Sequence, residues 1–194
     1  KQNKFSSLSS VTYRTRDAYT IGDSEGKATT TVDPDGTTIE EKANASTTTV
    51  YGYEIWDASQ KFGYAFTDKL SADLKGTFYH NKRDIRGSNK YQDFFIDYTV
   101  SGKMKYLIDE NQQLSVSYIH DTYKKDKDYF VAGFTRTDYR NRTQTARADY
   151  AGTFGSHTLS GGIEGNFEYL KHYMIKDSAD ASVETYSAYL QEDW

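Results

Sequence analysis

The stretch from Arg142 to Tyr173 constrains the fold most, because it alternates apolar and polar residues along two long arms. A tight turn, Gly155-Ser156-His157, joins them. The apolar positions are Ala146, Ala148, Tyr150, Gly152 and Phe154 in the first arm and Leu159, Gly161, Ile163, Gly165, Phe167 and Tyr169 in the second. Because successive strand residues point to opposite faces, the pattern predicts a hairpin with one apolar and one polar face. The arms match the ~9–11 residues of a tilted membrane-crossing strand.

The composition agrees with strands that cross a membrane around a wet interior. The 194 residues include 18 Tyr, 10 Phe and 2 Trp, whereas the aliphatic residues that fill soluble cores are sparse. Transmembrane barrels place aromatic residues at both lipid–water interfaces and need no apolar core. The single Pro also suits long strands, since proline removes a ladder donor. No apolar run approaches the ~20 residues of a transmembrane helix, so we expect strands to cross the bilayer.

Several function classes are excluded by what the sequence lacks. The chain has no cysteine, so it offers neither disulfides nor thiolate chemistry. Its net charge of −4 and scattered basic residues give no nucleic-acid footprint. There is no Gly-x-Ser-x-Gly motif and no metal-site spacing, so we expect no enzyme activity, cofactor or metal. No signal peptide opens the chain, and residues 1–5 are expected to start inside a strand.

In chain order the patterns predict an all-β, antiparallel transmembrane β-barrel wall, a single unit over residues 1–194. The eight strands are expected at about 3–20, 47–66, 70–84, 91–106, 113–123, 141–154, 158–175 and 183–194. A change of parity between Ile55 and Phe62 predicts a β-bulge near residues 57–60.

The connections alternate in length. Short turns are expected at 67–69, 107–112 and 154–157, and longer charged loops at 21–46, 84–90, 124–140 and 176–182. Outer-membrane barrels have short periplasmic turns and long extracellular loops. The alternation therefore predicts that the first, third, fifth and seventh strands run outward.

The polar face carries charges of both signs and is the candidate ligand-contacting surface. The residues expected to face a lumen are Arg14, Arg16, Asp73, Lys75, Asp93, Asp97, Lys103, Lys105, Arg147, Asp149, Glu164, Glu168 and His172. They either guide a charged ligand or bond to a plug, or they form a self-neutralising wall. Opposite charges on adjacent strands stabilise a sheet by ~0.2–1 kcal/mol per pair. We favour the neutral wall for most of them.

Three histidines near the outer strand ends are candidate ligands for haem iron or another metal. His80 and His120 continue the apolar faces through Phe78 and Tyr118, whereas His172 follows Glu168 onto the polar face. Because they lie on opposite faces, the three histidines are not expected to bind one metal ion together. We interpret them as residues of the interfacial aromatic girdle and of the barrel rim. His120 and Asp121 are also neighbours in sequence, but adjacent strand residues point apart, which argues against a catalytic pair.

The last strand, Tyr186-Ser-Ala-Tyr-Leu-Gln-Glu-Asp-Trp194, resembles a segment in the barrel wall of TonB-dependent outer-membrane receptors. In that segment Tyr-Leu-Gln precedes two acids and a Trp just above a periplasmic turn. The runs Gly155-Ser-His-Thr-Leu159 and Gly161-Gly-Ile-Glu164 resemble the preceding hairpin, and Tyr13-Arg-Thr-Arg-Asp17 is similar to an earlier outward strand. The resemblance covers residues 145–194 well and the rest loosely. Nothing in the chain resembles the family's plug or TonB box.

What the resemblance implies is an interior portion of a 22-stranded barrel in the bacterial outer membrane. The implied function is import of a large scarce nutrient: siderophore-iron, haem, cobalamin or a glycan. The implied partners are outer-membrane lipid, the remainder of the receptor with its plug, the TonB complex acting through that plug, and the nutrient itself.

The alternatives are a self-contained eight-stranded outer-membrane barrel with a binding, adhesin or structural role, a soluble adhesin-like domain, and a barrel enzyme. A narrow closed barrel would bury too many charges, each of which needs a partner. Glu192 also shares a face with Leu190 and Trp194, which is unfavourable in lipid. We therefore predict that residues 4–20 and 184–194 do not pair.

Overall fold

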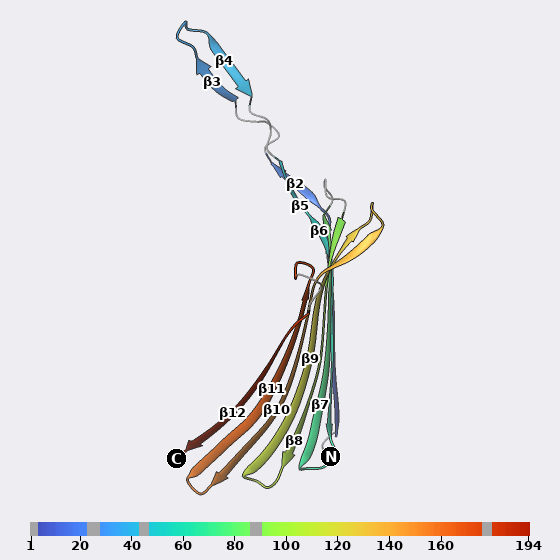
Figure 1. Ribbon diagram of the computed structural model, residues 1–194, viewed down its shortest axis with the longest axis vertical. Coiled ribbons are helices and arrows are strands. Elements are labelled where there is room, and N and C mark those ends of the chain that lie inside the picture. Colours follow the sequence, from blue (N-terminus) through green and yellow to red (C-terminus); the bar gives the residue numbers. More distant parts are fainter. Residues whose placement is uncertain (1–3, 23–27, 43–46, 86–90, 176–179) are drawn as a thin grey trace.

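A computed structural model describes residues 4–22, 28–42, 47–85, 91–175 and 180–194, and within these ranges the chain is all-β. Eight strands form one antiparallel sheet in the order β1-β6-β7-β8-β9-β10-β11-β12 (Figure 1). They are β1 (Phe5–Arg16), β6 (Gly52–Ala65), β7 (Leu70–Ile85), β8 (Tyr91–Leu107), β9 (Gln112–Tyr129), β10 (Phe134–Phe154), β11 (His157–His172) and β12 (Ala181–Asp193). The part of the chain described contains no helix long and apolar enough to cross a membrane.

Three short turns lie at the end of the sheet where both chain termini are found, as Figure 1 shows. They connect β6 to β7, β8 to β9 and β10 to β11, which confirms the predicted short turns. The last is the tightest, because Gly155 takes a left-handed backbone conformation with φ of 65°.

The segment 21–46, predicted to be a loop, contains paired strands instead. β2 (Tyr19–Gly22) pairs with β5 (Thr47–Val50), and β3 (Ala28–Val32) pairs with β4 (Thr38–Lys42). Figure 1 shows these pairs beyond the long-loop end of the main sheet. The predicted strands 3–20 and 47–66 are accordingly each divided in two. These short strands are rich in threonine, whose β-branched side chain favours an extended backbone. They therefore form without the alternation of apolar residues on which the prediction relied.

The segment 124–140 was also wrongly predicted to be a loop. β9 continues to Tyr129 and β10 begins at Phe134, so only residues 130–133 form the connection. Charged and polar side chains bond across these extensions, as Thr135 Oγ1 does to Asp128 at 3.0 Å. The predicted loops at 84–90 and 176–182 lie partly outside the described residues.

The sheet has a bulge, but not where the sequence predicted one. β6 pairs without interruption from Asp57 to Gln60 on both sides. Trp56 is the last apolar residue on the apolar face of β6, and Ile55, its neighbour, points to the polar face. The change of parity in the sequence therefore marks the end of the apolar pattern and not a bulge. The register shift instead lies between Thr137 and Tyr139 in β10.

The register divides the sheet into two faces, named here the apolar face and the polar face. One row across the apolar face is Tyr64, Ala72, Met104, Val116, Ala148, Ile163 and Ala188. Among the described residues no hydrophobic side chain is buried, and the buried positions are three glycines and five residues with polar side chains. Ile163, for example, is 65% exposed.

This uncovered apolar surface far exceeds what a soluble monomer exposes. In β7 it runs from Leu70 to His80. That stretch is about 34 Å long at ~3.4 Å per residue and spans about 26 Å when tilted by ~40°, close to the ~25 Å apolar band of outer-membrane barrels. We call this band the apolar belt.

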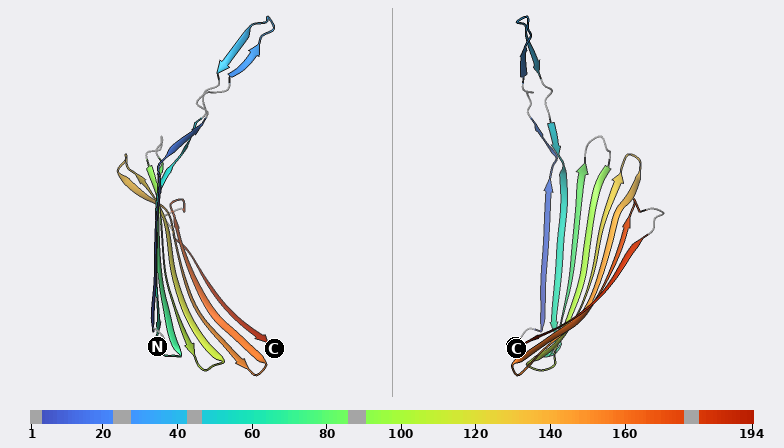
Figure 2. Two further views of the ribbon diagram at one scale, coloured as in Figure 1. Left: turned by 180° about the vertical axis from the view of Figure 1, so that it is seen from behind. Right: turned by 60° about the vertical axis from the view of Figure 1, so that its left-hand side comes forward.

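The two edge strands, β1 and β12, do not pair with each other within the described chain. β1 pairs with β6 and β12 pairs with β11. The right-hand view of Figure 2 shows the sheet as an open wall between these edges. The predicted absence of pairing between residues 4–20 and 184–194 is confirmed.

Candidate functional site

The short-turn half of the polar face is a wall of mutually compensating charges. Asp73 lies opposite Lys103 in the register and 3.3 Å from Lys61. Arg147 lies 2.8 Å from Asp149 and 3.7 Å from Glu164. Exposed pairs of this kind contribute ~0–1 kcal/mol each. The geometry supports the neutral-wall interpretation for this half.

Other predicted lumen residues lie on the same face, where the structure describes no ion pair for them. Arg14 lies opposite Ile55, and Lys75 lies between Ser101 and Lys61. The remaining members of this set are Asp97 opposite Tyr79 and Tyr123, Lys105 opposite Ser71 and Ser115, and Glu168 opposite Thr143 and Val183.

The histidines are dispersed, as parity predicted. His80 lies opposite Trp56 and Ile96 and His120 opposite Val100, all on the apolar face. On the polar face, His172 lies opposite Tyr139, with ring centroids 6.3 Å apart, and accepts a 3.1 Å hydrogen bond from the Met174 N–H at Nδ1. Asp121, on the face opposite His120, accepts a 2.7 Å hydrogen bond from Thr99. The three histidines therefore do not converge.

The long-loop half of the polar face differs in character, because aromatic rings and cations alternate across it. We call this the aromatic–cation band; its members are Arg16, Tyr53, Arg83, Tyr91, Phe95, Lys125 and Lys127. Arg16 lies 4.9 Å from the Tyr53 ring centre, and Lys127 lies 4.2 Å from that of Tyr91. Cation–π contacts of this kind contribute ~0.5–1 kcal/mol at exposed sites.

Sequence reasoning identified only Arg16 in this band. The signal it missed was the period-two run Tyr123, Lys125, Lys127 and Tyr129, which places all four on one face. Because the residues from 124 on are mostly charged, the sequence pattern predicts a loop there.

Strands β1, β6, β7 and β8 form a hollow of about 580 Å³ that shares Arg16, Tyr53 and Arg83 with this band. Its lining includes Arg16, Tyr51, Gly52, Tyr53, Ile55, Asn81, Arg83 and Asp93. Asn81 is 4% exposed and Asp93 is 8% exposed. The Asn81 amide donates to the Tyr79 hydroxyl at 2.9 Å, and one Asp93 oxygen lies 3.6 Å from Lys125 Nζ.

The single side-chain oxygen of Asn81 and the second carboxylate oxygen of Asp93, Oδ1 in each case, have no hydrogen-bond partner within the described residues. An unsatisfied buried polar atom costs about 1–3 kcal/mol. The hollow thus presents two acceptors that need donors, next to the guanidinium groups of Arg16 and Arg83.

Lys127 links Asp93 on β8 to the bulge in β10. It lies opposite Asp93 in the register, and its Nζ is 3.7 Å from Asp138. Burial disfavours the charged amine, but Asp93, then Tyr91 and Asp138, outweigh burial and raise the pKa of Lys127. The bulge therefore supplies a carboxylate that holds this cation in place.

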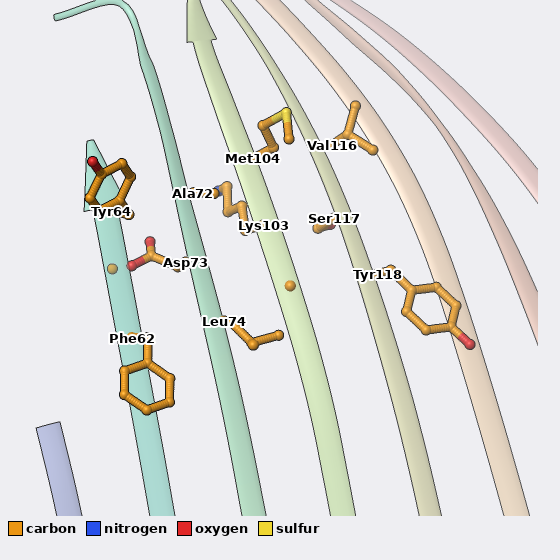
Figure 3. Close-up of a pocket in the computed structure, with 12 residues that line it drawn as sticks. Phe62, Tyr64, Ala72, Asp73, Leu74, Lys103, Met104, Val116, Ser117 and Tyr118 are labelled. Atoms are coloured by element: carbon orange, nitrogen blue, oxygen red, sulfur yellow. The ribbon is translucent and has the colours of Figure 1, made fainter. Parts of the chain in front are cut away.

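The apolar face has its own furrows. One, of about 440 Å³, runs over β6 to β9; Figure 3 shows Phe62, Leu74, Met104 and Tyr118 along it. Its lining on this face is apolar except for the Tyr64 and Tyr118 hydroxyls.

Neither a protein-family model nor a curated protein matches the sequence. Among solved structures, the chain is similar to the outer membrane transporter YddB from Escherichia coli, with a TM-score of 0.62 and 12% sequence identity. The match covers 98% of this chain and 30% of that one, so the chain spans less than a third of its neighbour's length.

Register, faces and structural neighbour together define the fold. It is an antiparallel transmembrane β-barrel wall, with short turns at one end and longer connections at the other. The barrel is not closed by these eight strands.

Proposed function

We propose that this chain forms part of the wall of an outer-membrane transporter, and more specifically of a TonB-dependent receptor. The observation that carries the proposal is the two-faced single layer: an apolar belt about 26 Å tall, backed by a charged face. The unpaired edges β1 and β12 support a wider barrel, because an open sheet edge is not viable in lipid. The narrower class rests on the resemblance of residues 145–194 to that receptor family.

In this proposal the bacterial outer membrane surrounds the apolar face, and acyl chains occupy the furrow of Figure 3. The polar face lines the interior, where its balanced charges contact water or a plug. The β2–β5 and β3–β4 pairs extend outside the cell and make the first contact with the nutrient. The TonB complex acts through the plug.

The ligand is a large scarce nutrient: siderophore-iron, haem, cobalamin or a glycan. As the nutrient moves inward, it contacts the hollow. Asn81 Oδ1 and Asp93 Oδ1 require hydrogen-bond donors, while Arg16 and Arg83 offer donors of their own. A ligand group that both donates and accepts hydrogen bonds satisfies the two sets together. The Tyr53 ring adds a flat surface for its apolar edge.

The test is uptake by cells that carry the full-length protein, assayed in turn with haem, cobalamin, ferric siderophores and oligosaccharides. Asn81→Leu retains the volume but removes the unpaired acceptor, and should reduce uptake of the cognate nutrient about tenfold or more. The matched control is Asn166→Leu on the same face in the short-turn half, where Asn166 already accepts from Thr145 at 3.0 Å. Equal uptake by wild type and Asn81→Leu, or no uptake of any nutrient by wild type, contradicts the proposal.

A further inference from the structure

Three cations lie directly opposite one another on three neighbouring strands. Lys124 on β9 pairs in register with Arg140 on β10, which in turn pairs with Lys171 on β11. Opposed side chains on one face of a sheet lie about 4.5–5.5 Å apart at Cβ, and like charges in that position destabilise the sheet. Such a row is unfavourable unless an anion lies against it.

Carboxylates in the described part of the chain neutralise only one of the three cations. Lys124 Nζ lies 2.5 Å from Asp126, but among the described residues no carboxylate forms an ion pair with Arg140 or Lys171. Arg140 Nε is buried, and it has no hydrogen-bond partner in the part of the chain that the structure describes. A buried, unpaired guanidinium nitrogen is costly, so this row lacks a negatively charged acceptor.

The position of the row indicates where that acceptor comes from. The three residues have the parity of the apolar face, and the same row continues through Ile96 and His80 at the upper edge of the apolar belt. One row below Arg140 on this face, Arg142 lies 4.9 Å from the Tyr169 ring centre. On each of their own strands the cations lie beyond the apolar residues toward the long-loop end, where lipid tails give way to headgroups.

We propose that Lys124, Arg140 and Lys171 form a docking surface for the phosphates of an anionic glycolipid in the outer leaflet. The proposal rests on the membrane orientation given under Proposed function. Arg140 offers several donors to one phosphate, and the flanking lysines neutralise its charge. Asp126 lies at one end of the surface and orients Lys124.

The test uses the full-length protein in detergent, titrated with lipid A and followed by native mass spectrometry. The variant Arg140→Ala/Lys171→Ala should bind lipid A about 30-fold more weakly, because each basic residue near an anionic surface contributes roughly fivefold. The control Lys75→Ala/Lys105→Ala removes the same charge from the polar face and should bind as wild type does. Arg140→Lys/Lys171→Arg, which keeps both charges, should retain binding.

Equal lipid A affinity in wild type and the alanine variant overturns the proposal, and so does equal loss in the polar-face control. Complete competition by inorganic phosphate at matched concentration also overturns it, since the site would then bind a free anion. If the alanine variant does not assemble, loss of lipid A binding by Arg140→Gln/Lys171→Gln supports the proposal and retained binding overturns it. Nutrient uptake should be unchanged in the variant, which separates this result from failure of the transport proposal.

Discussion

Tyr189 on β12 donates a 2.9 Å hydrogen bond to Asp149 on β10, reaching across β11. Gly162, which lies between them in the register, makes this contact possible. A Cβ at Gly162 would lie 2.5 Å from Asp149 Oδ1 and 2.7 Å from Tyr189 Cε1. The aromatic ring therefore covers a position that only glycine can occupy, and it joins three strands on the polar face.

Gly162→Ala should destabilise the full-length protein by about 1–3 kcal/mol, because the methyl group also lies 2.8 Å from the backbone oxygen of Ala148. Urea unfolding in detergent measures this. Gly76→Ala is the control, since a Cβ there meets nothing within 4 Å. That variant should be unchanged or slightly more stable. Equal loss in both variants would refute the packing argument.

The two faces should respond oppositely to a new cation. Ile163→Arg places a charge in the apolar belt and should cost about 2–4 kcal/mol, lowering the amount of assembled protein in the outer membrane. Ser187→Arg lies on the polar face opposite Glu164 and should be tolerated. Heat-modifiable mobility of membrane fractions checks both variants. Comparable assembly defects would contradict the assignment of faces.

The sidedness of the wall can be tested because the chain has no native cysteine. Thr30→Cys in the β3 strand should react with a membrane-impermeant maleimide on intact cells. Glu110→Cys in the turn between β8 and β9 should react only after the outer membrane is permeabilised. Labelling of Glu110→Cys alone on intact cells would invert the topology.

The ion pairs of Lys127 should be insensitive to pH near neutrality. Its pKa is raised in the folded protein above the ordinary 10.5. The stabilisation is therefore fully present below 10.5 and is lost as pH rises through the higher folded-state value. The stability difference between wild type and Lys127→Met should stay constant from about pH 6 to 9 and shrink in strong alkali. A change centred near neutral pH would show that another group titrates there.

Much of the fold was predictable because period two is a local property. The alternation from Ala146 to Tyr169 fixed which side chains share a face, and glycine and polar residues marked the short turns. The strands from Tyr19 to Val50 and beyond Tyr123 were missed, since threonine-rich and charged segments show no apolar alternation yet can still form backbone ladders. The bulge at Thr137 leaves no sign in the spacing of apolar residues.

The sequence by itself determined which face of the sheet each side chain occupies. Arg147 and Glu164 belong to the polar face, and Ile163 belongs to the apolar face. Only the tertiary structure decided which residues stand opposite each other. The hollow around Asn81 and Asp93, the row through Arg140 and the bond from Tyr189 to Asp149 all depend on the register between two or more strands. Register is set by turn geometry together with the apolar patterns of both strands, so it depends on how two whole strands meet and cannot be read from either strand alone.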